Sequence, residues 1–268
     1  MALGIVPVVL LLSSRALVGL MLGLVGGGGS VLAVPLLVYL VGVPSAHVAI
    51  GTAAVAVALN AASGLATHAR LGTVKWPCAM VFTAAGVAGA FLGASLGKRL
   101  DGTELLALFG VLMIGIGIYM LSLRPKAAGH DVRLTPDTAA YLLPRLLAIG
   151  LGVGLLSGFF GIGGGFLIVP GLVLATGMAL QNAIGTSLFA VTAFGAATAS
   201  SYAASGLVDW RLALLVIAGG VAGSLIGTRA NAKLALHRRA LAATFASVVI
   251  TVGLYVAVSG LTKLFALG

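Results

Sequence analysis

Charged residues are scarce in this sequence. They make up 7% of its 268 residues, whereas hydrophobic residues make up 60%, and a soluble domain carries about 25% charged residues. Five residues are acidic, and none of them lies inside a long apolar run. Several of these runs reach the roughly 20 residues that a helix needs to cross a bilayer core. The composition therefore excludes an ordinary soluble protein and predicts an all-α polytopic membrane protein.

Cysteine is nearly absent, which limits metal and redox chemistry. Cys78 is the single cysteine, so the chain can form neither an intrachain disulfide nor a cysteine zinc site. His47 and His68 lie at opposite ends of one apolar segment, about 30 Å apart along a helix, and cannot share a metal ion. The apolar runs contain no pair of carboxylates and no nucleophile beside a base. We expect no cofactor, no metal site and no enzymatic activity.

The chain is basic, with a net charge of +10, but the distribution of this charge does not indicate nucleic-acid binding. Lys and Arg occur mainly in the short connections, where they set orientation and face anionic lipid headgroups. A basic face with interleaved aromatic residues is missing. The apolar run 2–12 lacks a preceding positive charge and continues into a longer pattern, so we do not interpret it as a cleaved signal peptide. We expect these basic residues to face the lipid bilayer, which is the predicted partner of the protein.

A glycine-rich motif occurs twice. Gly26–Gly29 precede Pro35, and Gly161–Gly165 precede Pro170, with the prolines 170 − 35 = 135 positions apart. After one deleted residue near 43–48 the spacing becomes 186 − 52 = 134, and it holds for the pairs Thr52 and Thr186, Gly72 and Gly206, Lys75 and Asp209, and Trp76 and Trp210. Two similar halves, each with a glycine-rich break in an apolar stretch, are typical of transporters whose site lies between the halves.

Each half contains five apolar segments. They cover residues 3–24, 30–43, 46–68, 76–97 and 104–123 in the first half, and residues 138–158, 165–178, 180–203, 209–229 and 240–262 in the second. We therefore divide the chain into an N-terminal transmembrane repeat (1–123), a polar inter-repeat linker (124–137) and a C-terminal transmembrane repeat (138–268). The second segment of each half is short for a full crossing. It either re-enters or is extended across the membrane by its glycine segment.

The distribution of positive charge favours inverted repeats. Lys and Arg of short loops collect on the cytoplasmic side of a membrane. With five crossings per half, one face holds Lys98, Arg99, Arg211 and Lys263, and the other holds Arg70, Lys75, Arg124, Lys126, Arg133, Arg145, Arg229, Lys233, Arg238 and Arg239. An even number of crossings gives a more even division. We therefore expect five segments per inverted repeat, with both termini outside the cytoplasm.

The glycine segments are the main candidates for a binding site near the membrane midplane. Consecutive glycines let backbone N–H groups approach a ligand closely, because glycine has no Cβ. Each segment precedes a helix start, whose free N–H donors and partial positive charge favour an anion. The candidates are Gly26, Gly27, Gly28, Gly29 and Ser30 in the first half and Gly161, Gly163, Gly164 and Gly165 in the second. Their alternative role is tight packing.

Polar side chains can complete such a site. Thr52 and the pair Thr186-Ser187 occupy equivalent positions of the third segments, and Asn60 lies two turns after Thr52. Hydrogen bonding between helices is an equal alternative for all four. Arg15 lies within the first apolar segment, where a charged residue is costly and no acidic residue is available to pair with it. A bound anion is one partner for Arg15, and snorkelling to the interface is the alternative.

Small residues recur at every fourth position in two segments. Gly89, Gly93 and Gly97 in the first half, and Gly219, Gly223 and Gly227 in the second, give helices faces that can pack closely. We expect these faces to pack within one chain, although the pattern leaves a homodimer open.

Several of these motifs resemble one family of transporters. They are Gly23–Pro35, Gly158–Pro170, Ile50-Gly51-Thr52, Ile184–Ser187 and Gly206–Trp210. The sequence resembles the TauE/SafE family of sulfite and organosulfonate exporters over nearly the whole chain. The resemblance implies a multi-pass permease of the bacterial inner membrane for small sulfur-containing anions. Lys75 departs from the motif, because the second half has Asp209 at that position.

The direction of transport follows from energetics only in part. An inside-negative potential drives an anion outward by about 2.3 kcal/mol per charge per 100 mV, so export needs neither ATP nor an intramembrane carboxylate. We therefore expect export of a small anionic substrate by alternating access between the halves. Uptake of a sulfur compound and an anion channel are the alternatives.

Overall fold

The computed structural model describes residues 30–122, 136–161, 163–218, 220 and 238–267, and its elements there are helices. Five helices are long and apolar enough to cross a membrane: α3 (Ala46–Arg70), α4 (Trp76–Gly97), α5 (Gly102–Ser122), α6 (Pro136–Phe160) and α8 (Leu180–Ala203). The others are α2 (Ser30–Pro35) with its continuation η2 (Leu36–Leu40), α7 (Gly165–Thr176), residues 210–218 and 220, and α10 (Arg238–Leu267).

These bounds confirm the expected segments 30–43, 46–68, 76–97, 104–123, 138–158, 165–178, 180–203 and 240–262, with shifts of a few residues at their ends. The expected segment 3–24 and most of the linker lie outside the described residues. Within the expected segment 209–229, the structure describes residues 209–218 and 220.

Local chemistry accounts for several helix ends. The Ser45 side chain caps α3 by accepting a hydrogen bond from the Val48 N–H (3.4 Å). Pro77 lies in the first turn of α4, where a missing N–H costs nothing. Pro35 ends the regular part of α2, and the chain continues as the wider π-helical turn η2.

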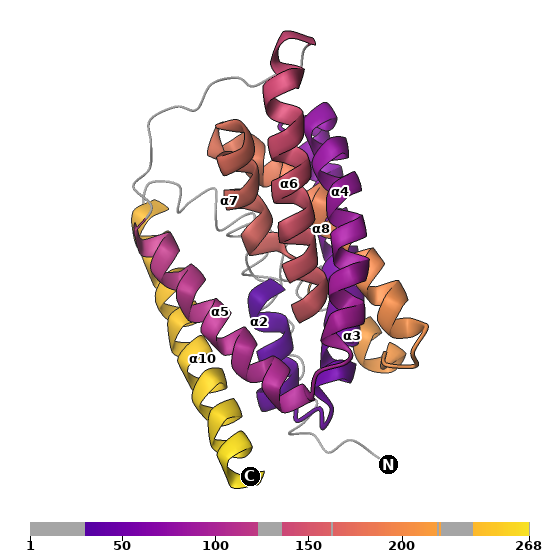
Figure 1. The fold of residues 1–268 in the computed structure, drawn as a ribbon, viewed down its shortest axis with the longest axis vertical. Helices are drawn as coiled ribbons and strands as arrows, with labels where there is room; N and C mark the ends of the chain where they lie inside the picture. Colours follow the sequence, from indigo (N-terminus) through magenta and orange to yellow (C-terminus); the bar gives the residue numbers. More distant parts are fainter. Residues whose placement is uncertain (1–29, 123–135, 162, 219, 221–237, 268) are drawn as a thin grey trace.

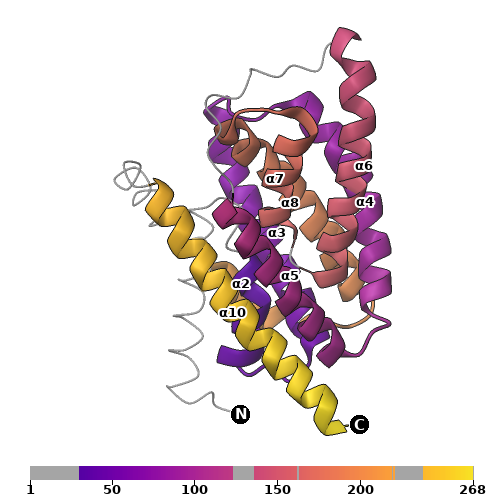
Figure 2. The same cartoon turned by 60° about the vertical axis from the view of Figure 1, so that its left-hand side comes forward.

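The six long helices α3, α4, α5, α6, α8 and α10 pack in three pairs (Figures 1 and 2). α4 and α6 run parallel, since Gly86 lies near Gly150 and Gly93 near Leu155 and Phe159. α3 and α8 run antiparallel, because Gly64 contacts Leu188 and Gly51 contacts Tyr202. α5 and α10 are also antiparallel, because Gly110 contacts Ala257 and Gly117 contacts Ile250. α5 and α10 lie together on one side of the molecule, and α4 and α6 lie on the other (Figure 1).

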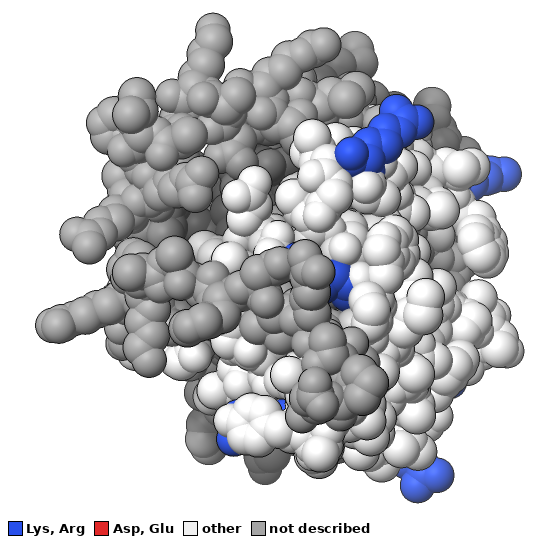
Figure 3. Space-filling view, turned by 90° about the horizontal axis from the view of Figure 1, so that it is seen from above, with Lys and Arg blue, Asp and Glu red and all other residues white. Residues whose placement is uncertain are grey.

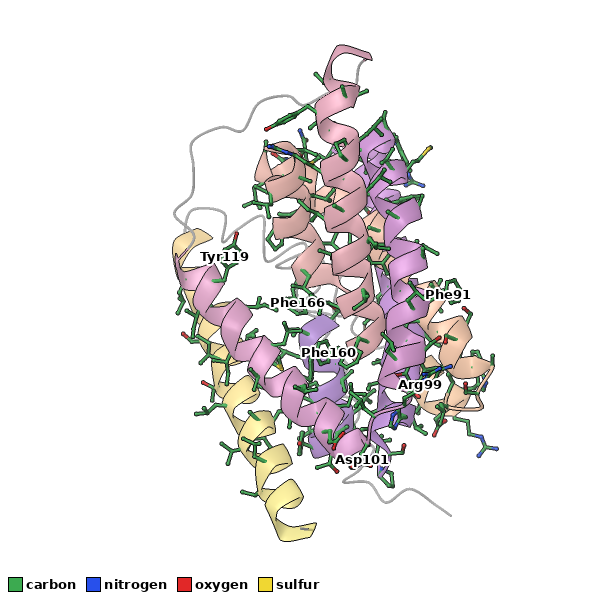
Figure 4. The ribbon with its side chains drawn as sticks, in the orientation of Figure 1. Phe91, Arg99, Asp101, Tyr119, Phe160 and Phe166 are labelled. Atoms are coloured by element: carbon green, nitrogen blue, oxygen red, sulfur yellow. The ribbon has the colours of Figure 1, made fainter. Side chains whose placement is uncertain are left out.

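The two ends of the bundle can be named from these directions. The upper end of Figure 1 holds the starts of α4, α6 and α8 and the ends of α3 and α5. The lower end holds the starts of α3 and α5 and the ends of α4, α6 and α8. Arg99 and Asp101 lie toward the lower end, and Tyr119, near the end of α5, lies above both (Figure 4).

Contacts between the two halves occur in reciprocal pairs. Thr52 Oγ1 accepts a hydrogen bond from the Asp209 N–H (3.0 Å), and Thr186 Oγ1 accepts one from the Lys75 N–H (3.0 Å). Both partners of the second bond are the 134-position counterparts of those in the first. Three further pairs of contacts are reciprocal in the same way. Gly51 packs on Leu207 as Gly185 packs on Thr73, and Gly86 packs on Phe194 as Gly220 packs on Asn60. Gly117 packs on Ile250 as Gly253 packs on Ile114, here at a spacing of 253 − 117 = 136. Equivalent units around a two-fold axis make contacts of this kind.

Candidate substrate site

The segment Gly161–Gly165 joins α6 to α7 through backbone that only glycine adopts readily. Gly161, Gly163 and Gly164 have φ angles of 65°, 65° and 70°, in the left-handed region. Gly164 is the N-cap of α7, and its carbonyl accepts hydrogen bonds from the N–H groups of Leu167 (2.9 Å) and Ile168 (2.8 Å). A side chain at any of these three positions would therefore strain the start of α7.

This glycine segment lies where α3 and α8 pass each other. Gly161 packs against Ile50, one turn into α3, and Gly163 packs against Val57 near the middle of α3 and Val191 of α8. Val57 and Val191 are counterparts at the spacing of 134. The described glycines of the segment are all buried. The irregular backbone is thus enclosed by protein at the centre of the α3–α8 crossing.

The path of the chain through the site leads from one end of the molecule to the other. α6 ends near the lower end, where Phe159 packs on Gly97, the last residue of α4. The glycine segment then passes from the level of Ile50 to that of Val57, and α7 continues to the upper end, where α8 begins. Phe160 and Phe166, on either side of the segment, face the space between α6 and α5, where Phe160 meets Phe109 (Figure 4). The short second segment of this half therefore returns the chain across the bundle.

The start of α7 supplies the electrostatics of the site. The first N–H groups of a helix have no acceptor within it, and the helix dipole adds a partial positive charge there. α7 is 12 residues long and begins at Gly165, beside the buried glycine segment. Such an end can bind a small anion without a cationic side chain.

Thr52 and Thr186 lie at opposite ends of the α3–α8 pair. Gly51 is level with Tyr202, while Gly64 is level with Leu188, so about 20 Å of helical rise separates the two threonines. Both hydroxyls are fully buried and hold the backbone amides of Asp209 and Lys75. Ser187 is also buried, and its Oγ donates to the Ile184 carbonyl (2.7 Å). In this arrangement one small ligand cannot touch both ends.

Asn60 is the polar candidate nearest to the centre of α3. It lies one turn beyond Val57, is 4% exposed and packs against Gly220. Neither Oδ1 nor Nδ2 of its amide has a hydrogen-bond partner among the residues that the structure describes. Buried amides are normally satisfied, so this side chain retains unused donor and acceptor capacity.

Ser157 is a polar residue that the sequence reasoning missed. It is fully buried on α6, and its Oγ lies against Gly164, 2.8 Å from where a Cβ on that glycine would be. Within the described part of the chain, the hydroxyl has no hydrogen-bond partner. The sequence does distinguish Ser157 in one way, because it is the single polar side chain between Arg145 and Thr176.

The remaining candidates fall partly outside the described residues. Arg15 and Gly26–Gly29 do so entirely. Ser30, the counterpart of Gly165, is buried at the start of α2. Among the described residues no group of three His, Cys, Asp or Glu side chains is placed to hold a metal ion.

Comparison with known proteins decides the family. The family model described as "Sulfite exporter TauE/SafE" matches residues 11–256. This chain belongs to the TauE/SafE family. The TauE/SafE proteins are membrane transporters and not enzymes, in agreement with the all-helical bundle and its five spanning helices.

Relatives of this TauE/SafE chain occur in bacteria and archaea. A probable membrane transporter protein of Xylella fastidiosa (strain Temecula1) is 46% identical over 248 residues, which cover 91% of this chain and 93% of the relative. YdhB of Bacillus subtilis is 29% identical over 80% of this chain and 86% of its own length, and MJ0441 of Methanocaldococcus jannaschii is 31% identical over 62% and 63%. No solved structure is significantly similar to this chain.

Proposed function

We propose that this TauE/SafE protein exports a small sulfur oxyanion, such as sulfite or an organosulfonate, across the bacterial inner membrane. The observation that carries the proposal is the buried glycine segment at the α3–α8 crossing, with the start of α7 beside it. Backbone N–H groups there suit an anion. The family description supplies the sulfur chemistry.

Two inverted repeats are the proposed framework for alternating access. Support comes from the reciprocal contacts between the halves, which fit a two-fold relation. Further support comes from the counterpart helices α3 and α8, which pack antiparallel, as do α5 and α10. If these helices cross the membrane, an antiparallel relation between counterparts requires an axis in the membrane plane. The equivalent segment Gly26–Gly29 is proposed to contribute to the same site.

The threonine bonds suggest how each end closes. Thr52 ties the connection before Trp210 to α3 at the lower end, and Thr186 ties the connection before Trp76 to α8 at the upper end. We propose that opening toward one side breaks one of these bonds and leaves its counterpart intact. Asn60, with its unused amide, contacts the anion at the centre, and Ser187 lies on the route from the upper end.

The test is sulfite flux in proteoliposomes with a matched pair of glycine variants. Gly164 and Gly177 cap the two ends of α7, and both have φ near 70°, so alanine imposes a similar backbone strain at each. Gly177 is exposed with open space around it, whereas Gly164 lies in the proposed site. We expect Gly164→Ala to abolish radiolabelled sulfite flux and Gly177→Ala to retain it. Equal flux in both variants would remove the glycine segment from the site.

Competitors and membrane potential separate the related functions. Excess unlabelled taurine, sulfoacetate or sulfate identifies which anions share the site. Flux that follows an imposed potential by about 2.3 kcal/mol per charge per 100 mV supports facilitated anion movement. Countertransport of labelled against unlabelled sulfite supports alternating access, whereas its absence at high turnover indicates a channel.

A further inference from the structure

We propose that the Ser157 hydroxyl is a substrate-binding donor that acts together with the start of α7. The inference rests on the proposed function, because it places a side chain in the same site and names what that side chain contributes. The ligand is a small oxyanion, and the probe is sulfite.

The first argument is the unmet hydrogen-bonding capacity of Ser157. The residue is 0% exposed, and its Oγ has no hydrogen-bond partner in the described ranges of the chain. Serine and threonine in membrane helices commonly donate to a carbonyl one turn earlier. Ser187 and Thr176 do so here, at 2.7 Å each. Ser157 does not, so its hydroxyl is left with an unsatisfied donor that a ligand can use.

The second argument is where the hydroxyl lies. Ser157 Oγ is close to Gly164, the N-cap residue of α7, and a side chain at Gly164 would run into it. The donor and the free N–H groups of the helix start therefore adjoin the same space. An oxyanion with several oxygens can accept from both at once, and a bond between a hydroxyl and a charged oxygen is among the stronger hydrogen bonds in proteins.

The third argument concerns symmetry. The counterpart of Ser157, 135 positions earlier, is Leu22, which carries no donor. The counterpart of Asn60 is Phe194, which stacks on Phe82. The side-chain donors around the glycine segment are thus not duplicated. We infer that a single anion binds off the axis, held by the second half through Ser157.

The experiment compares Ser157→Ala with Thr198→Val in purified protein, using sulfite-induced thermal stabilisation and sulfite flux. Thr198 is also fully buried on α8, with a hydroxyl that has no partner among the described residues. The atoms nearest to a Cβ on Gly164 belong to Ser157 and Ile168 and not to Thr198, which makes Thr198 a matched control. Neither change should lower the unfolding temperature without sulfite, since neither hydroxyl bonds to the protein. We expect Ser157→Ala to raise the sulfite concentration for half-maximal stabilisation roughly ten- to hundredfold, and the KM of flux with it. Thr198→Val should match the wild type.

Three results would overturn the inference. If Ser157→Ala binds sulfite as the wild type does, Ser157 is not a donor, and the glycine site remains. If Ser157→Ala unfolds at a lower temperature while its response to sulfite is unchanged, the residue has a structural role. If the wild type itself neither binds nor transports sulfite, the proposed function fails, and the role of Ser157 fails with it.

Discussion

Thr52 and Thr186 each hold a backbone amide of the opposite half. This explains why Lys75 and Asp209 can occupy equivalent positions despite opposite charges. The bond to each threonine is made by the backbone N–H, which both residues have, and not by the side chain. The sequence showed that the two threonines were equivalent. It could not show which groups bind to them, because the partners are backbone amides more than 100 positions away, at Lys75 and Asp209, and no sequence motif marks a backbone amide as a donor.

At this scale we expect Thr52→Val to lower stability by about 1–3 kcal/mol. The change keeps the shape of the side chain but leaves the part-buried Asp209 N–H without its acceptor. Thermal unfolding of the detergent-solubilised protein measures the effect. Thr52→Ser keeps the hydroxyl and should recover most of the loss, and Thr186→Val should resemble Thr52→Val. An unchanged unfolding temperature in Thr52→Val would show that the bond carries no net stability.

The contact between α4 and α6 shows which kinds of residue are buried between helices of this bundle. The buried side of α4 consists largely of small residues, including Gly89, Gly93 and Gly97, which confirms that this ridge packs within one chain. Large apolar side chains such as Met80 and Leu92 point outward, at 59% and 57% exposed. Lipid is as apolar as leucine, so van der Waals contact between backbones holds such helices together.

The pair Gly154 and Gly152 on α6 tests this packing. A methyl group on Gly154 would meet the backbone of Gly86 on α4, whereas one on Gly152, on the exposed side, would meet nothing within 4 Å. We expect Gly154→Ala to cost about 1–3 kcal/mol through overpacking. Gly152→Ala should be neutral or stabilising by up to about 1 kcal/mol, because alanine favours a helix. Thermal unfolding compares the two, and equal effects would contradict the close α4–α6 contact.

The helix bounds were predictable from the sequence, and the faces of the helices were not. Polar residues and prolines interrupt the apolar runs, so α4 and α8 begin and end where the sequence predicts. The helices are apolar on all sides, so hydropathy does not indicate which side is buried. The glycine segment Gly161–Gly165 was recognisable because few other residues adopt its backbone. Ser157 was not, since its role depends on how α6 is rotated relative to Gly164.

Across the whole molecule, charge differs between the two ends. The upper end carries Arg70, Lys75 and Arg145. Among the side chains that the structure describes, a view from above shows basic ones and no acidic ones (Figure 3). At the lower end, the basic residues Lys98, Arg99 and Arg211 are accompanied by Asp101, Glu104 and Asp209. The upper end also has one acidic residue, Asp137 in the first turn of α6, so Lys and Arg remain in excess there. This excess supports a cytoplasmic position for that end. Trp76 and Trp210, counterparts at opposite ends, are both exposed, as interfacial tryptophans are.

Cysteine labelling of two counterpart positions tests the orientation and the inverted relation together. Leu71 and Ser205 are 134 positions apart, are both exposed, and lie at the upper and lower ends respectively. Cys78, the single native cysteine, is 1% exposed and gives little background. We expect Ser205→Cys to react with a membrane-impermeant maleimide on intact cells, and Leu71→Cys to react only after the cells are permeabilised. Labelling of both from the same side would mean parallel repeats, because counterparts of inverted repeats must face opposite compartments. Labelling of Leu71→Cys alone on intact cells would keep the inversion but reverse the orientation, and export would then have to proceed from the lower end.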